Sequence, residues 1–178
     1  PTLTVDISGD HTALTFFDSG DMIMQRNVDF GLDQIIDIVA RERWVSNERA
    51  DELLRTSEII SEDLPPTAAI AEPLFFSIDM IRRTMAYYTR NRGMAPVEQV
   101  LLMGDAVCYQ GLRELLEAQL SVPVTSLTNL RGVSVPRSGA LHEQAMRFLD
   151  NYGAVIAPVG FLSQDQGQYP RWITITNW

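Results

Sequence analysis

The residues best suited to chemistry surround a short turn near the start of the chain. A carboxylate, Asp6, comes at the end of an alternating apolar and polar run, and the turn that follows contains Ser8, Gly9, Asp10 and Thr12. Backbone N–H groups of such a turn can bind a phosphate chain, while Asp6 can hold a metal-bound water. The same residues are also typical of an ordinary hairpin, so the pattern alone leaves both interpretations open.

A second group of candidate residues follows the apolar run 100–103. Gly104, Asp105 and Ala106 form a predicted turn, and a helix is expected to start at Gly111. A buried strand that ends in glycine and leads into a helix brings backbone close to a flat ligand, as in adenine sites at the carboxyl ends of strands. An ordinary strand–turn–helix joint would look the same, so this group alone is not decisive.

The composition favours a globular protein and argues against a nucleic-acid partner. The 178 residues are 46% hydrophobic, which is enough for one sizeable core. The formal net charge is −9, and the 14 basic residues are all arginines that form no basic stripe. Because the chain contains no lysine, chemistry that needs a P-loop or Schiff-base lysine is excluded.

The sequence is also typical of a cytoplasmic protein without direct membrane insertion. A single cysteine, Cys108, cannot form an intramolecular disulfide, and the two histidines, His11 and His142, are too few for a zinc site. No apolar run has the length of a membrane span, and residues 1–6 lack the features of a signal peptide. The chain starts with proline and opens directly into a strand-like run, so we expect a part of the protein upstream.

Hydrophobic periodicity places both groups of candidate residues in an α/β arrangement. Alternation predicts a three-stranded antiparallel meander, and spacings of three and four residues predict the helices. The predicted strands are 3–7, 12–17, 22–28, 97–103 and 122–127, and the predicted helices are 32–39, 48–57, 70–88 and 111–120. The later strands are expected to be parallel. Residues 139–162 form a last predicted helical region, and the tail 164–178 is either an edge strand or irregular.

Taken together, the two groups resemble motifs of the actin, sugar kinase and Hsp70 superfamily. The hairpin resembles its second phosphate motif, and the later strand, turn and helix resemble its adenosine motif. Within the superfamily the chain looks most like PilM and its relative FtsA. The features that carry this resemblance are the Asp18-Ser19-Gly20 turn with Arg26 and Gly31 after it, the long helix leading to residues 101–104, and the run 120–124.

The resemblance implies an actin-like (ribonuclease H-like) domain with a mixed sheet, flanking helices and a small helical lobe. Residues 1–162 would be the second domain of such a fold, with the lobe at about 34–66, and residues 163–178 would be a C-terminal extension. It implies ATP with Mg as cofactor, with Asp6 as the metal-linked carboxylate. The implied nucleotide contacts are Asp6, Ser8, Gly9, Asp10, Thr12, Gly104, Asp105 and Ala106.

The chain departs from the family motifs at two of these positions. Ser8 replaces the first glycine of the phosphate motif, and Asp105 replaces the second glycine of the adenosine motif. Both changes weaken nucleotide binding, and no segment resembles the first domain of the superfamily. We therefore expect half of an ATP-binding cleft, with weak or absent nucleotide binding and no turnover by this chain alone.

The function that the resemblance implies is scaffolding. The expected protein is a cytoplasmic component of type IV pilus assembly that lies at the inner membrane through partners and docks a PilN-like inner-membrane protein. Self-association into a ring is left open. Two alternatives remain: an active ATPase or sugar-kinase-like enzyme once a first domain is supplied, and an FtsA-like polymerising protein, for which the sequence lacks a C-terminal amphipathic membrane helix.

Overall fold

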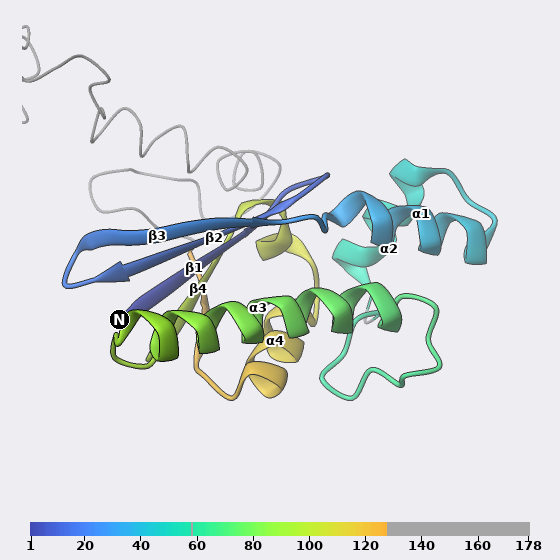
Figure 1. Cartoon of the computed structure of the whole chain (residues 1–178). Coiled ribbons are helices and arrows are strands. Elements are labelled where there is room, and N and C mark those ends of the chain that lie inside the picture. The colour runs from blue at the N-terminus through green and yellow to red at the C-terminus, as the bar shows by residue number, and fades with distance from the viewer. Residues whose placement is uncertain (58, 128–178) are drawn as a thin grey trace, which may run out of the picture.

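The computed structural model describes residues 1–57 and 59–127, which form a mixed α/β fold (Figure 1). The strands are β1 (Thr2–Ile7), β2 (Thr12–Asp18), β3 (Asp21–Val28), β4 (Gln99–Met103) and β5 (Val124–Ser126). The helices are α1 (Leu32–Arg43), α2 (Asn47–Thr56), α3 (Ala71–Arg92), the 3-10 helix η1 (Gly104–Cys108) and α4 (Leu112–Leu120).

Each element predicted within this range is present, with ends that differ by a few residues. The turn expected at 104–106 is instead the start of η1, which continues to Cys108. The predictions for residues 139–162 and for the tail 164–178 lie outside the described residues.

The five strands form one mixed sheet in the order β3-β2-β1-β4-β5. The first three strands pair antiparallel as the predicted meander, with a bulge between Phe16 and Phe17. Strand β4 lies parallel to β1 on one side and to β5 on the other. The parallel arrangement of the later strands is therefore confirmed, and β1 stands at the centre of the sheet.

One face of the sheet forms the core, and helices α3 and α4 cover it (Figure 1). In β1 the buried residues alternate, so Leu3, Val5 and Ile7 point to this face. Between the sheet and α3, the ring of Phe16 in β2 stacks on the ring of Tyr88, with ring centroids 4.6 Å apart. This packing fixes the C-terminal part of α3 against the sheet.

Helices α1 and α2 extend from one end of the sheet as a separate pair (Figure 1). Helix α2 begins after Ser46, whose side chain accepts a hydrogen bond from the Arg49 N–H at 3.4 Å. Helix α3 ends at Gly93, where φ is 62°. Within the described part of the chain, none of the helices combines the length and the apolar character that crossing a membrane requires.

Candidate functional site

The two groups of candidate residues lie side by side at one edge of the sheet. Strands β1 and β4 are parallel neighbours, and Asp6 pairs with Met103, the residue before Gly104. At Gly104 φ is +72°, and an added Cβ would lie 2.3 Å from Oδ1 of Asp6. The backbone after β4 therefore approaches the Asp6 carboxylate as closely as a glycine allows. Ligands of α/β proteins bind at this kind of edge, beyond the carboxyl ends of the strands.

The hairpin turn between β1 and β2 is bonded to the start of α1. The carbonyl oxygens of Ser8 and Gly9 accept hydrogen bonds from the N–H groups of Leu32 and Asp33, each at 2.9 Å. The first N–H groups of a helix have no partner within the helix, so the hairpin supplies these partners here. The turn is thereby fixed against the helix, and these two carbonyl groups are engaged by α1.

A close backbone contact makes this junction possible. An added Cβ on Gly31 would lie 2.2 Å from the carbonyl oxygen of Gly9, and one on Gly9 would lie 2.9 Å from Oδ2 of Asp33. The backbone of Gly31 is extended, with φ of −143°, so conformation alone does not require glycine there. Space requires it instead, because backbone lies against backbone.

Thr12 is fully buried at the start of β2. Its hydroxyl donates a 2.7 Å hydrogen bond to the carbonyl oxygen of Phe30, which belongs to the segment entering α1. The hydroxyl thus holds two segments of the chain together. Its contact with a phosphate stays a prediction.

Asp10 lies at the exposed tip of the same turn. Its Oδ1 is 2.6 Å from Nδ1 of His11, and the hydrogen bond to His11 lowers the pKa of the Asp10 carboxyl below its usual range. The tip of the hairpin therefore carries a negative charge over most of the pH range. Near an anionic phosphate this charge is unfavourable unless a cation lies between them.

Asp105 and Ala106 occupy the first turn of η1, beside Gly104. Ala106 is fully buried and Asp105 is partly buried. Contact of a nucleotide with these residues stays a prediction.

A cluster that the sequence did not predict joins α2 to the end of η1. The Tyr109 hydroxyl donates a 2.6 Å hydrogen bond to Oδ1 of Asp51, and Nε of Arg55 donates one of 2.8 Å to Oδ2. The Arg55 guanidinium carbon lies 5.1 Å from the centre of the Tyr109 ring, within the range of a cation–π contact. Next to the cluster, the Gln110 N–H donates to the Leu54 carbonyl oxygen at 3.2 Å.

Burial and hydrogen bonding fix the charges in this cluster. Burial, and then the hydrogen bond to Asp51, raise the pKa of the Tyr109 hydroxyl well above its usual range. Burial is the largest single influence on Arg55 and lowers its pKa, but the hydrogen bond to Asp51 and the charge of that carboxylate together raise the pKa of the guanidinium above its usual value. Asp51 and Arg55 are an i, i+4 pair that the sequence could have revealed. Nothing in the spacing of the chain pointed to Tyr109.

Across residues 1–57 and 59–127, no three His, Cys, Asp or Glu side chains gather in a way that could hold a metal ion. The prediction that Asp6 binds a metal through water needs no such group, and it stays a prediction.

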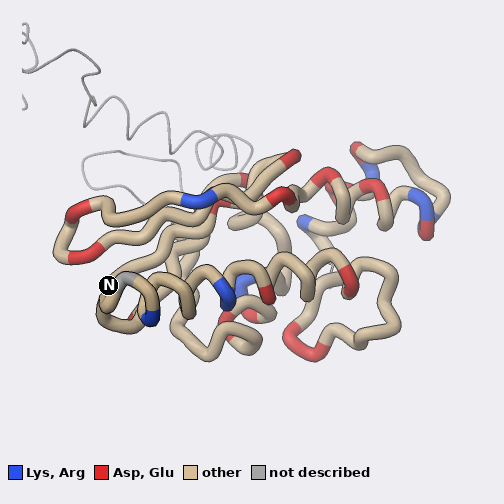
Figure 2. The backbone as a smooth tube through the Cα atoms, viewed as in Figure 1, with Lys and Arg blue, Asp and Glu red and all other residues tan. Residues whose placement is uncertain are grey.

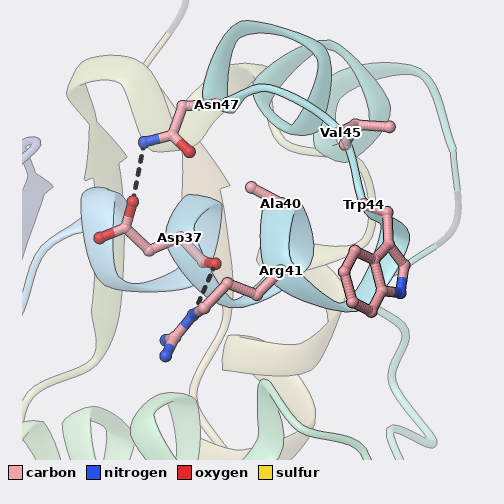
Figure 3. A pocket seen from close by; sticks show the side chains of 6 residues that line it. All are labelled: Asp37, Ala40, Arg41, Trp44, Val45 and Asn47. Atoms are coloured by element: carbon pink, nitrogen blue, oxygen red, sulfur yellow. Dashed lines mark hydrogen bonds between the residues drawn. The ribbon is translucent and has the colours of Figure 1, made fainter.

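An open groove lies at the corner between α1 and α2, away from the sheet edge (Figure 3). Its volume is about 780 Å³, and Asp37, Ala40, Arg41, Trp44, Val45 and Asn47 line it. Asn47 donates a 2.8 Å hydrogen bond from Nδ2 to Oδ1 of Asp37, which joins the two helices across the groove. Trp44 ends α1 with φ of 55°, and its side chain is 94% exposed.

The chain matches the family model described as type IV pilus assembly protein PilM over residues 2–154. Among solved structures, it superposes on a chain of a PilM-PilN type IV pilus biogenesis complex with a TM-score of 0.69 and 21% identity. That alignment covers 87% of this chain and 45% of the other, so this chain spans less than half the length of that protein.

Two further structures share the fold. One is the ethanolamine utilization protein EutJ from Carboxydothermus hydrogenoformans, at a TM-score of 0.51 and 16% identity, with 70% of this chain and 43% of that one covered. The other is a non-polymerising MamK mutant bound to AMPPNP, at 0.50 and 16%, with 72% and 50% covered. A comparison with curated proteins gives no match. The shared architecture is the actin-like fold, which confirms the predicted fold class.

Proposed function

The chain belongs to the PilM family of type IV pilus assembly proteins, and on that premise we propose that it is part of a cytoplasmic scaffold with a partial nucleotide site. The family match over residues 2–154 carries this proposal. The scaffold docks a PilN-like inner-membrane assembly protein and lies at the membrane through that partner. The similarity to a chain of a PilM-PilN type IV pilus biogenesis complex supports the choice of partner.

The nucleotide site is partial because this chain supplies one wall of a cleft. Asp6 would hold a Mg-bound water, the backbone of Ser8, Gly9 and Asp10 would face the phosphates, and the start of η1 from Gly104 to Ala106 would face the nucleoside. The close approach of Gly104 to Asp6 supports a shared site at this edge. ATP with Mg would supply the phosphoryl group, whose transfer needs an aligned nucleophile and charge stabilisation on both sides.

Three observations support weak binding at this wall. The Thr12 hydroxyl is bonded to the Phe30 carbonyl group, the charged Asp10 stands at the tip of the turn, and Asp105 adds a carboxylate beside Gly104. Two carboxylates near a phosphate chain oppose its binding by Coulomb repulsion.

A second candidate function is ATP hydrolysis by the complete protein when a first domain closes the cleft. The observation that favours it is the convergence of Asp6 and Gly104 at the carboxyl ends of the parallel strands β1 and β4, where ligands of α/β proteins bind. The two functions predict different rates of ATP hydrolysis and a different effect of Asp105 on nucleotide affinity.

The test uses the complete protein and measures three quantities: phosphate release, nucleotide affinity, and capture of a peptide with the N-terminal sequence of the PilN-like partner. We expect peptide capture without turnover. Asp105→Gly should strengthen nucleotide binding roughly three-fold to thirty-fold, since it removes a charge and a side chain. Asp21→Gly removes a carboxylate at the distant β2–β3 turn and serves as the matched control.

Metal-dependent phosphate release that disappears in Asp6→Ala would favour the ATPase. An unchanged or weaker affinity in Asp105→Gly would remove the argument for a degraded site. Failure to capture the peptide would contradict the scaffold proposal directly.

A further inference from the structure

Helix α3 has one face packed in the core and one face turned to solvent. Its buried residues include Leu74, Ile78, Ile81 and Tyr88, which lie against the sheet. The Arg82 guanidinium donates a 2.8 Å hydrogen bond to the Gln119 carbonyl oxygen at the end of α4 and so anchors the helix further. The outer face of α3 therefore has a fixed orientation and cannot rotate into the core.

The outer face follows the spacing of a helix-pairing surface. Along it, alternating steps of four and three residues connect Glu72, Phe76, Asp79, Arg83, Ala86 and Arg90. Steps of this kind keep side chains on one line of a helix, as at the contact positions of a coiled coil. Phe76 is 60% exposed, and Tyr87, beside Ala86, is 45% exposed. The outer face therefore carries two large exposed aromatic rings, one in each half of the helix.

The charges on this line are arranged symmetrically about Ile81, with opposite sign on either side. Glu72 lies nine residues before Ile81 and Arg90 nine after it, and the same relation holds for Asp79 and Arg83 at two residues. Figure 2 shows acidic residues along the N-terminal half of α3 and basic residues along its C-terminal half. Phe76 and Ala86 occupy the matching positions five residues from the centre, a large side chain opposite a small one.

From this pattern we infer that α3 is a self-pairing surface, on which α3 of a second copy of this chain lies antiparallel across a two-fold axis near Ile81. Such a pair places Glu72 against the partner's Arg90, and Asp79 against the partner's Arg83. It also places Phe76 over the partner's Ala86, next to the partner's Tyr87. A two-fold interface requires such self-complementarity, because each contact occurs twice.

A parallel pair has no such match. It would place Glu72 against the partner's Glu72 and Arg90 against the partner's Arg90, and like charges at such distances are unfavourable. Asp79 already bonds Arg83 within the helix, with Oδ2 2.7 Å from Nε. In the antiparallel pair the partner's Arg83 joins this bond without separating it, because a carboxylate accepts more than one donor.

The length of the outer face of α3 limits the affinity of the two copies for each other. From Glu72 to Arg90 the helix rises about 27 Å, at roughly 1.5 Å per residue. One helix face of this length buries less than the roughly 1,200 Å² of a stable interface. The pair is therefore weak in dilute solution and becomes significant where other contacts hold several copies close together. The inference rests on α3 alone and does not depend on the proposed function.

The test is sedimentation equilibrium of the full chain over a range of concentrations, with two charge variants. Glu72→Arg with Asp79→Arg makes the line entirely basic, and Arg83→Glu with Arg90→Glu makes it entirely acidic. Each variant alone should dimerise roughly thirty-fold more weakly than the parent, since four exposed ion pairs become repulsive. An equimolar mixture should form a heterodimer, and raised salt should weaken it.

The matched control for the basic variant is Glu48→Arg with Glu52→Arg on α2, which changes the net charge by the same amount as Glu72→Arg with Asp79→Arg and should leave dimerisation unaltered. Circular dichroism checks that every variant folds. A mixture that stays as monomeric as its components would overturn the inference, and so would a control that weakens the dimer as strongly as the α3 variants.

The direction of the pair is tested with single cysteines in a Cys108→Ser background. A mixture of Phe76→Cys and Ala86→Cys chains should form an oxidised heterodimer, because these positions face each other in the antiparallel pair. Ala86→Cys alone should not cross-link, since its two copies lie about 15 Å apart along the axis at roughly 1.5 Å per residue. Cross-linking of Ala86→Cys alone in preference to the mixture would indicate a parallel pair and contradict the proposal.

Discussion

Glycine usually occupies positions with a positive φ, and larger residues usually occupy extended or helical positions. Gly31 at the junction of the hairpin with α1 and Trp44 at the corner between α1 and α2 do the opposite. Gly31 has an extended backbone that any residue can adopt, yet an added Cβ would lie 2.2 Å from a carbonyl oxygen. Trp44 has φ of 55°, where glycine is favoured, yet it carries the largest side chain and is 94% exposed.

The difference lies in what surrounds the two residues. A left-handed backbone costs a side-chain-bearing residue about 1–2 kcal/mol, which a helix end can accept. An atom placed inside a backbone contact forces two segments apart, and such overpacking costs about 1–3 kcal/mol or more. Packing therefore selects the residue at the junction, whereas at the corner the side chain is almost fully exposed and packing among the described residues does not select it. Substitutions at Gly31 and Trp44 test this contrast, and one at Tyr109 extends it to the junction between α2 and η1.

The largest effect is expected for Gly31→Ala. The new methyl group would overlap the Gly9 carbonyl oxygen and break the hydrogen bonds that join the hairpin to α1, so we expect the free energy of unfolding to fall by about 3 kcal/mol or more. Urea denaturation followed by circular dichroism measures this loss. Gly20→Ala is the matched control, because Gly20 has φ of +94° but no atom within 4 Å. Equal losses in the two variants would show that space does not select Gly31.

An intermediate effect is expected for Tyr109→Phe, which tests the junction between α2 and η1. Loss of the 2.6 Å hydrogen bond to Asp51 should reduce the free energy of unfolding by about 1–2 kcal/mol at neutral pH. Tyr87→Phe alters a half-exposed tyrosine and should change the free energy of unfolding little.

The pH dependence of the same variant sharpens the test. In the folded chain the pKa of Tyr109 is raised above the usual value of about 10, so the folded state keeps a proton that the unfolded state releases. The stabilisation is therefore complete below about pH 10 and is lost as the pH rises further. In Tyr109→Phe the fall in stability above pH 10 should be smaller than in the parent chain. An identical alkaline profile would mean that Tyr109 ionises freely in the folded state.

The smallest effect is expected for Trp44→Ala. Because the side chain is almost fully exposed, its removal should change the free energy of unfolding by less than about 0.5 kcal/mol. Trp44→Gly should stabilise the chain by up to about 1 kcal/mol, because glycine adopts a positive φ without strain. Thermal denaturation distinguishes these outcomes. A loss above 1 kcal/mol in Trp44→Ala would show that packing selects the residue at the corner, as it does at Gly31.

Much of the fold could be predicted from local patterns. Alternation in residues 3–7 and 12–17 specified the strands, and apolar residues three and four positions apart specified the helices. Asp6 and Gly104 could be identified as strand-end residues because each follows an apolar run, and parallel pairing then brings the two ends to one edge. These features depend on neighbours along the chain, which a sequence displays directly.

The contacts that define the junctions depend on segments distant along the chain, and only the tertiary structure decided them. Asp51 and Tyr109 are 58 residues apart, and no spacing rule links them. The need for glycine at Gly31 arises from the position of Gly9, and its own backbone angles give no sign of it. Sequence by itself determined where strands and helices form, because that choice is made by backbone preference and periodic burial. The packing of those elements against one another decided which atoms are in contact. At Gly31 this packing leaves no room even for a single methyl group.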